Sequence, residues 1–202
     1  MTRDERLLIV FSKNPVAGRV KTRLAASIGE QAALLVYEEL RSITRRVTSA
    51  ADCTRAVFYS DFIPEEDLLL DGSTGAYLQE GDDLGERMHR AFIEGFRLGF
   101  RHVVLIGTDC PELSTFLIDR AFEALDDHDA VLGPARDGGF YLVGLVHPLP
   151  ELFLERKWSN PEVLRESLRI LRKQRTDCAI LPALSDIDTI EDLEESGLWQ
   201  QH

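Results

Sequence analysis

The sequence of 202 residues predicts an α/β fold with a mostly parallel central sheet flanked by helices. Short, fully apolar runs alternate along the chain with longer segments in which apolar residues recur at helical spacing. Residues suited to ligand binding follow several of these runs, and ligands in α/β sheets bind beyond the carboxyl ends of the strands. No repeat, low-complexity tract or linker divides the sequence, so we expect residues 1–202 to form a single domain.

The apolar runs predict the strands. The first run, Leu7–Phe11, is typical of a strand buried in a parallel sheet. Later runs predict further strands at Ala56–Tyr59, Val103–Ile106, Ala130–Leu132, Phe140–Val146 and Cys178–Leu181.

Helices are predicted between the strands. From Ile28 to Val47 the apolar residues follow the period of a helix. The same pattern predicts helices over Leu84–Phe96, ending near Gly99, then Ser114–Leu125, then Pro161–Arg172, and finally one that begins near Thr189. Pro161 suits a first helical turn, and Thr189 with Asp192 resembles a capping box.

Composition and charge restrict the partners. Thirty-five acidic residues against 23 Lys and Arg give a net charge of −12, which disfavours nucleic acid and membrane surfaces. The first apolar run is too short for a signal peptide or a membrane span. Three widely spaced cysteines fit a reducing compartment, so we expect a cytoplasmic protein. The sequence does not indicate an oligomeric state.

A basic loop follows the first predicted strand. Residues 7–29 contain no Asp or Glu, yet they hold Lys13, Arg19, Lys21 and Arg23 within eleven residues. Such cations can bind phosphate oxygens, and Gly18 would let backbone N–H groups approach an anion. The loop has neither the P-loop order nor the dinucleotide G-x-G-x-x-G pattern. The alternative is a solvated basic loop.

Carboxylates follow the ends of other predicted elements. Asp109 lies three residues past the end of Val103–Ile106, and hard carboxylate oxygens suit Mg²⁺ or Mn²⁺ bridging to a diphosphate. Alternatively, Asp109 or Ser114 caps the next helix. Asp186 and Asp188 share one side of an extended segment, where a metal-ligand role and a helix start are compatible.

Two further segments carry polar candidates. Asp137, Gly138 and Gly139 precede a strand, which suits close backbone approach to a ligand or a tight turn. Asp137 could act as a base, accept a bond from a sugar hydroxyl, or form the turn. Gln79, two residues before Gly81, can pair with a base edge through its amide donor and acceptor.

Five motifs together resemble one bacterial family, the DUF2064 glycosyltransferases, also called radical-SAM/selenodomain-associated transferase 1 and linked to arsenosugar biosynthesis. They are F-S-K-x-P-x-x-G-x-x-K-T-R-L (11–24), Q-x-G-x-x-L-G-x-R-M (79–88), G-T-D-C-P (107–111), G-P-A-x-D-G-G-F-Y-L-V-G (133–144) and D-I-D-T (186–189). The resemblance runs from residue 7 to about residue 193. It implies a single GT-A-like domain of the nucleotide-diphospho-sugar transferase superfamily. The first motif is also similar to guanylyltransferases that activate 2-phospholactate, whose signature loop carries K-x-R-L.

The resemblance also implies roles for individual residues. Lys13, Lys21 and Arg23 would hold nucleotide phosphates, and Gln79 and Gly81 would lie near the base. Asp109 would bind Mg²⁺ or Mn²⁺, and Asp188, with Asp186, would supply a second acidic contact. Asp137, Gly138 and Gly139 would face the donor sugar or the acceptor.

The chain departs from related patterns at two places. Thr108-Asp109-Cys110 supplies one Asp where GT-A enzymes usually carry D-x-D. The first loop has only Gly18 where nucleotidyltransferases of this fold usually carry G-x-G-x-R.

These features favour a glycosyltransferase that uses a nucleotide-diphosphate sugar, a divalent metal and a small-molecule acceptor. A cation at Asp109 and the basic loop would stabilise the diphosphate leaving group, with Asp137 as base for the acceptor hydroxyl. One alternative is a nucleotidyltransferase that joins an NTP to a small phosphorylated acid, and another is a nucleotide-binding module without turnover. The three differ in product: nucleoside diphosphate, pyrophosphate or neither.

Overall fold

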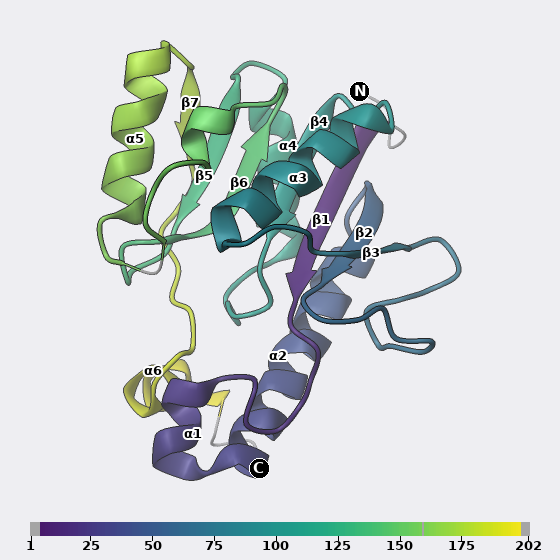
Figure 1. Ribbon diagram of the computed structural model, residues 1–202, viewed down its shortest axis with the longest axis vertical. Helices are drawn as coiled ribbons and strands as arrows, with labels where there is room; N and C mark the ends of the chain where they lie inside the picture. Colours follow the sequence, from purple (N-terminus) through teal and green to yellow (C-terminus); the bar gives the residue numbers. More distant parts are fainter. Residues whose placement is uncertain (1–4, 159, 199–202) are drawn as a thin grey trace.

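A computed structural model of the protein describes residues 5–158 and 160–198 (Figure 1). Its centre is one seven-stranded sheet in the order β3-β2-β1-β4-β6-β5-β7. The strands are β1 (Arg6–Ser12), β2 (Thr54–Tyr59), β3 (Gly75–Leu78), β4 (His102–Ile106), β5 (Ala130–Pro134), β6 (Phe140–Leu145) and β7 (Cys178–Ile180). All neighbouring pairs are parallel except the two that involve β6. The predicted α/β class and mostly parallel sheet are therefore confirmed.

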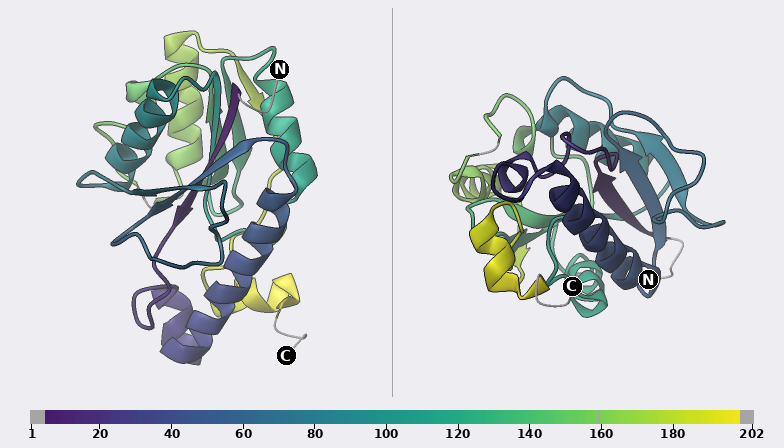
Figure 2. Two further views of the ribbon diagram at one scale, coloured as in Figure 1. Left: turned by 90° about the vertical axis from the view of Figure 1, so that its right-hand side faces the viewer. Right: turned by 90° about the horizontal axis from the view of Figure 1, so that it is seen from below.

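Helices cover both faces of this sheet. They are α1 (Thr22–Ile28), α2 (Glu30–Ser49), α3 (Leu84–Arg97), α4 (Thr115–Ala124), α5 (Val163–Gln174) and α6 (Ile190–Ser196), with a short 3₁₀ turn, η2 (Pro150–Leu152). Helices α3 and α5 bury their apolar sides against one face, and α4 does so against the other (Figure 2, left). None of the helices in the described part of the chain has the length and hydropathy needed to cross a bilayer.

A third, smaller apolar cluster lies beyond the carboxyl end of β1. It joins α1, the first half of α2 and α6 through Leu24, Val36, Leu40, Ile187 and Leu193. Figure 1 shows these three helices grouped below the sheet. The cluster brings the N-terminal loop and the C-terminal segment to the same edge of the sheet, which is the edge where an α/β fold binds its ligand.

The structure differs from the sequence prediction in several places. The expected helix from Ile28 to Val47 is two helices, because Gly29 has a φ of +86° and separates α1 from α2. Leu35 follows the predicted apolar period but is 67% exposed. Helix α5 begins at Val163 rather than at Pro161. Strand β3 was not predicted, because it is a short edge strand without an apolar run.

A buried ion pair fastens the loop after β2 beneath α2. The side chains of Arg41 and Asp67 are 2% and 7% exposed, and Arg41 donates to Asp67 at 2.5 Å. Tyr59, at the end of β2, donates its hydroxyl to the other Asp67 oxygen at 2.9 Å. Arg41 also donates to the Ser12 hydroxyl, at 3.3 Å. Because a buried charge without a partner is costly, this loop depends on the pair.

We expect Arg41→Met to lower the free energy of unfolding by about 3–5 kcal/mol, because it leaves the Asp67 carboxylate buried without its counter-ion. Tyr59→Phe should cost only about 1 kcal/mol, since it removes one hydrogen bond. Urea unfolding measures both. The double variant Arg41→Met with Asp67→Leu should recover much of the loss, and equal costs for the two single variants would contradict a dominant role of the ion pair.

Candidate active site

A cavity of about 670 Å³ opens at the carboxyl ends of the parallel strands. Its walls come from the loop after β1, the start of α1, the ends of β3 and β4, the turn before β6 and the segment before α6. The predicted site residues that line it are Lys13, Lys21, Arg23, Gln79, Asp109, Asp137, Gly139, Asp186 and Asp188. Three others, Gly18, Gly81 and Gly138, are not among its lining residues.

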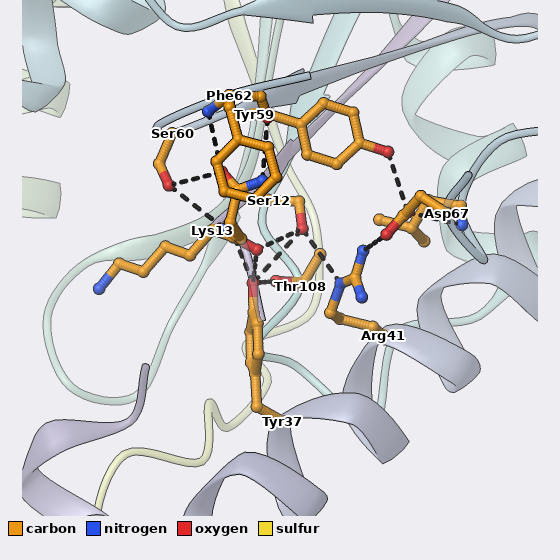
Figure 3. A network of polar contacts seen from close by, with 11 residues as sticks. Ser12, Lys13, Tyr37, Arg41, Tyr59, Ser60, Phe62, Asp67 and Thr108 are labelled. Atoms are coloured by element: carbon orange, nitrogen blue, oxygen red, sulfur yellow. Dashed lines mark hydrogen bonds and ion pairs between the residues drawn. The ribbon is translucent and has the colours of Figure 1, made fainter. Parts of the chain in front are cut away.

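The hydroxyl of Tyr37 ties the ends of two neighbouring strands together (Figure 3). It accepts hydrogen bonds from the Lys13 backbone N–H at 2.9 Å and from Thr108 Oγ1 at 3.1 Å, and donates to the Lys13 carbonyl at 3.1 Å. Burial and the nearby Asp109 charge raise the pKa of Tyr37, so the phenol keeps its proton. The Tyr37 side chain, from α2, thereby positions both Lys13, which follows β1, and Thr108, which precedes Asp109.

Asn14 holds the first part of the basic loop in place. Its buried amide donates to the Phe62 carbonyl at 2.9 Å and accepts from the Asp61 N–H at 3.0 Å. Lys13 is exposed at the cavity, and its ammonium makes no ion pair with any described residue (Figure 3). Arg19 is 70% exposed, lies 3.9 Å from Asp61 and does not line the cavity. Arg19 therefore fits the alternative of a solvated basic loop. The other three cations of the loop, Lys13, Lys21 and Arg23, line the cavity.

Lys21 is the buried cation of the site. It occupies the N-cap position of α1 with a φ of +47°, and its side chain is 4% exposed. Its Nζ lies 2.5 Å from Asp109 Oδ1 and 3.1 Å from Asp188 Oδ1. Burial alone would lower the pKa of Lys21, but the two carboxylates outweigh it and hold the pKa above its ordinary value. Arg23 is exposed and lies 3.6 Å from the second oxygen of Asp188.

Asp186 is a half-buried aspartate at this wall that makes no ion pair with any described residue. Its Oδ1 is buried and has no hydrogen-bond partner among the described residues. Burial, followed by the charges of Asp109 and Asp137, raises the pKa of Asp186 to about 7. A strongly shifted pKa in a cavity is a mark of a functional group.

The donor set suits a divalent cation that is shared with a ligand. The described residues hold no group of three or more His, Cys, Asp or Glu arranged to bind an ion by themselves. Asp109, Asp186 and Asp188 nevertheless line the same cavity, and Asp186 Oδ1 has no hydrogen-bond partner among the described residues. Mg²⁺ usually takes one or two carboxylates, substrate phosphates and water rather than an all-protein cage. The residues present fit that arrangement.

Local contacts refine the expectations for Gln79 and Asp137. The Gln79 amide nitrogen points to the backbone carbonyls of Phe58 at 2.8 Å and Ser12 at 3.5 Å, which leaves its carbonyl oxygen for a ligand. From the sequence, Gln79 is expected to pair with a base edge through both its amide donor and its acceptor. In the structure only the acceptor oxygen is left for such a pair. Asp137 accepts from the Gly139 N–H at 2.8 Å, so it forms the turn and lines the cavity at the same time.

The three predicted glycines outside the cavity have structural roles. At Gly138, with a φ of +94°, a Cβ atom would lie 2.1 Å from the Pro161 carbonyl oxygen. Gly18 has a φ of +77° and turns the basic loop. The Gly81 carbonyl accepts from Arg87 Nε at 3.0 Å, next to the start of α3.

Asp109 does not cap α4, because Ser114 fills that role, and Thr189 forms the predicted capping box of α6.

Sequence reasoning missed the aromatic part of the cavity. Phe140 and Trp158 line it beside Pro161, and their rings meet edge to face with centroids 6.0 Å apart. The indole N–H donates to the Phe153 carbonyl at 3.2 Å, which fixes the ring. No local pattern in the sequence indicates that the Trp158 ring faces a cavity.

Comparisons with known proteins agree with this arrangement. The family model described as "Uncharacterized protein conserved in bacteria (DUF2064)" matches residues 43–160. A crystal structure from Desulfovibrio desulfuricans G20, provisionally named a nucleotide-diphospho-sugar transferase, is 29% identical over 98% of this chain and 87% of that chain, with a TM-score of 0.89. No curated protein matches the chain.

More distant structures show the fold alone. A 4-diphosphocytidyl-2C-methyl-D-erythritol synthase from Anaerococcus prevotii DSM 20548 is 11% identical, covering 98% of this chain and 97% of its own, with a TM-score of 0.63. Rv0371c from Mycobacterium tuberculosis H37Rv, in complex with manganese, is 12% identical, covering 96% and 98%, with a TM-score of 0.54. The predicted nucleotide-diphospho-sugar transferase fold is therefore confirmed.

The raised pKa of Asp186 predicts a pH dependence of stability. Its pKa rises from 3.8 to about 7 on folding, so the folded state binds the proton more tightly. The contribution of Asp186 to stability is thus fully present at low pH and falls as the pH rises from about 4 to 7. Relative to wild type, Asp186→Asn should gain about 2–4 kcal/mol at pH 8 and little at pH 4. Urea unfolding in metal-free buffer at several pH values measures this difference.

Asp82→Asn, which removes an exposed aspartate outside the cavity, controls for the loss of one charge. A stability difference between wild type and Asp186→Asn that stays constant with pH would contradict the assignment.

Proposed function

Since this chain belongs to the DUF2064 family of bacterial proteins, and its phosphate-type cations and metal-type carboxylates line one cavity, we propose that it is a glycosyltransferase that uses a nucleotide-diphosphate sugar with Mg²⁺ or Mn²⁺. The observation that carries the proposal is Lys21, buried against Asp109 and Asp188 in the cavity that Asp186 also lines. A protein that needed only a stable fold would gain little from this cluster, because buried charges are weak stabilisers.

The nucleotide half of the cavity is proposed to bind the diphosphate. The Lys13 ammonium makes no ion pair with any described residue, and Arg23 presents an exposed guanidinium to the same cavity. Lys binds phosphate as a point charge and Arg as a two-pronged donor. The Gln79 carbonyl oxygen, at the end of β3, is the group proposed to accept a hydrogen bond from the base.

The carboxylates Asp109, Asp186 and Asp188 are proposed to hold the divalent cation jointly with the phosphates. Such a cation, when bound, offsets the negative charge that develops on the diphosphate leaving group. The chain contributes position: Tyr37 fixes the strand end that precedes Asp109 through Thr108. Because these groups are fixed before the reaction, little reorganisation is needed in the transition state.

The other half of the cavity is proposed to receive the sugar and the acceptor. Asp137 lies there with Gly139 and the aromatic pair Phe140 and Trp158. One Asp137 oxygen accepts the Gly139 N–H, which orients the carboxylate, and the other is free to take a proton from an acceptor hydroxyl. The aromatic rings would exclude water from the sugar–phosphate bond that breaks during transfer.

A nucleotidyltransferase is the second candidate function. The fold shared with the A. prevotii synthase favours it, whereas the single Gly18 in place of a glycine-rich loop disfavours it. Product analysis separates the two. With a sugar nucleotide and an acceptor, a glycosyltransferase releases a nucleoside diphosphate; with an NTP and a phosphorylated acid, a nucleotidyltransferase releases pyrophosphate. A module that only binds releases neither.

A thermal-shift panel tests the ligand class first. Nucleoside diphosphates, NTPs and sugar nucleotides are each added with Mg²⁺, with Mn²⁺ and with a chelator. We expect a sugar nucleotide with metal to stabilise the protein more than the matching NTP with metal. Greater stabilisation by an NTP, followed by pyrophosphate release, would replace the first candidate with the second.

We expect Lys21→Ala and Asp109→Ala each to lower kcat/KM by roughly 10²–10³-fold, because each removes a charge that acts on the diphosphate. Both should also lose most of the nucleotide-induced thermal shift while keeping a native circular dichroism spectrum. The matched control is Arg19→Ala, which removes a cation from the same loop but outside the cavity and should keep wild-type activity. Equal loss in the control, or unchanged ligand shifts in both test variants, would contradict the site.

A further inference from the structure

Lys21 occupies a position between two of the carboxylates proposed to hold the divalent cation. We propose that Lys21 is a resident counter-ion for Asp109 and Asp188, so that the cavity accepts its divalent cation only together with diphosphate, as a metal–nucleotide complex. This inference rests on the proposed function and names the form in which the ligand is taken up. It also makes Lys21 the residue that selects for that form.

The distances set up a competition for the same oxygen atoms. The Lys21 ammonium lies 2.5 Å from Asp109 Oδ1 and 3.1 Å from Asp188 Oδ1. A divalent cation bound to these oxygens would lie about 2.0–2.6 Å from each. Two positive charges cannot share that space, so the ammonium must leave before the oxygens become ligands. A metal ion alone offers the displaced ammonium no new partner.

The surroundings allow Lys21 to change partners without unfolding the site. Its backbone is fixed at the start of α1, where the Lys21 carbonyl accepts from the Ala25 N–H at 2.7 Å. Its side chain is a flexible four-carbon stem that ends in three donors. Lys13 and Arg23 line the same cavity, so phosphates bound by them would come within reach of the Lys21 stem. A bound diphosphate can therefore accept the ammonium and release the carboxylates.

Lys13 provides a matched comparison within the same cavity. Both lysines line it, but the Lys13 ammonium has no carboxylate partner among the described residues, whereas Lys21 has two. Replacing either lysine by Met removes one positive charge and keeps most of the stem. If only the total charge of the cavity mattered, both variants would change the Mn²⁺ affinity equally. If a resident counter-ion must be displaced, only the variant at position 21 would raise the affinity.

The test is equilibrium dialysis of Mn²⁺ alone against wild type, Lys21→Met and Lys13→Met, without nucleotide. We expect Lys21→Met to bind Mn²⁺ at least tenfold more tightly than wild type, and Lys13→Met to stay within threefold of wild type. Equal affinity of wild type and Lys21→Met would overturn the inference, as would an equal gain in Lys13→Met. Circular dichroism confirms that each variant is folded.

A second arm uses wild type only and does not depend on the variants folding. Inorganic pyrophosphate, and separately each nucleoside diphosphate, is added at saturating concentration and the Mn²⁺ affinity of the protein is measured again. We expect at least tenfold tighter Mn²⁺ binding with diphosphate than without it. Mn²⁺ affinity that does not change with diphosphate would contradict the inference.

The two hypotheses fail differently. If sugar nucleotides bind with Mn²⁺ but Mn²⁺ alone binds wild type as tightly as Lys21→Met, the inference is wrong and the proposed function stands. If no nucleotide, sugar nucleotide or pyrophosphate binds with any metal, the proposed function is wrong and the inference falls with it.

Discussion

A buried ammonium needs anionic partners, and the architecture around the cavity follows from that requirement at Lys21. Its two partners come from distant parts of the chain: Asp109 follows β4, and Asp188 precedes α6. The ion pairs therefore link the first helix, the centre of the sheet and the C-terminal segment. The apolar cluster that contains Leu24, Ile187 and Leu193 supports the same junction. The cost of burying these charges is met by apolar packing, since buried ion pairs contribute little net stability themselves.

The second determinant of the site is hydrogen bonding at the ends of β1 and β4. Tyr37 joins the Lys13 backbone to Thr108, and Arg41 joins Ser12 to Asp67 (Figure 3). These groups come from α2, from the carboxyl ends of β1 and β4 or the residues that follow them, and from the loop after β2. Their buried polar atoms are satisfied by one another, which specifies a single arrangement of the strand ends. The loops that carry the candidate binding groups are thus mounted on a rigid base.

Much of this arrangement was predictable, and the exceptions have physical reasons. Apolar runs identify strands that are buried on both faces, but β3 lies at an edge and half-exposed, so its sequence lacks that signal. Helical periodicity predicted the helix that contains α2, but it could not show that the chain breaks at Gly29, between α1 and α2. The rule for strand ends selects Asp109 and Lys21, and both residues line one cavity in the structure. Their contact with each other and with Asp188 depends on packing between segments up to 167 residues apart, which no local pattern encodes.

The charge inside the cavity reconciles a net charge of −12 with an anionic ligand. Its lining carries three cations, Lys13, Lys21 and Arg23, against four aspartates, so it is nearly neutral while the rest of the protein is acidic. Asp186 reduces the imbalance further, because its pKa of about 7 leaves it partly protonated near neutral pH. A diphosphate entering alone would meet no net positive charge. A divalent cation entering with it would supply the missing charge, since Coulombic attraction between close charges is stronger near a protein surface than in bulk water. The electrostatics of the cavity therefore favour joint entry of metal and diphosphate, in agreement with the position of Lys21.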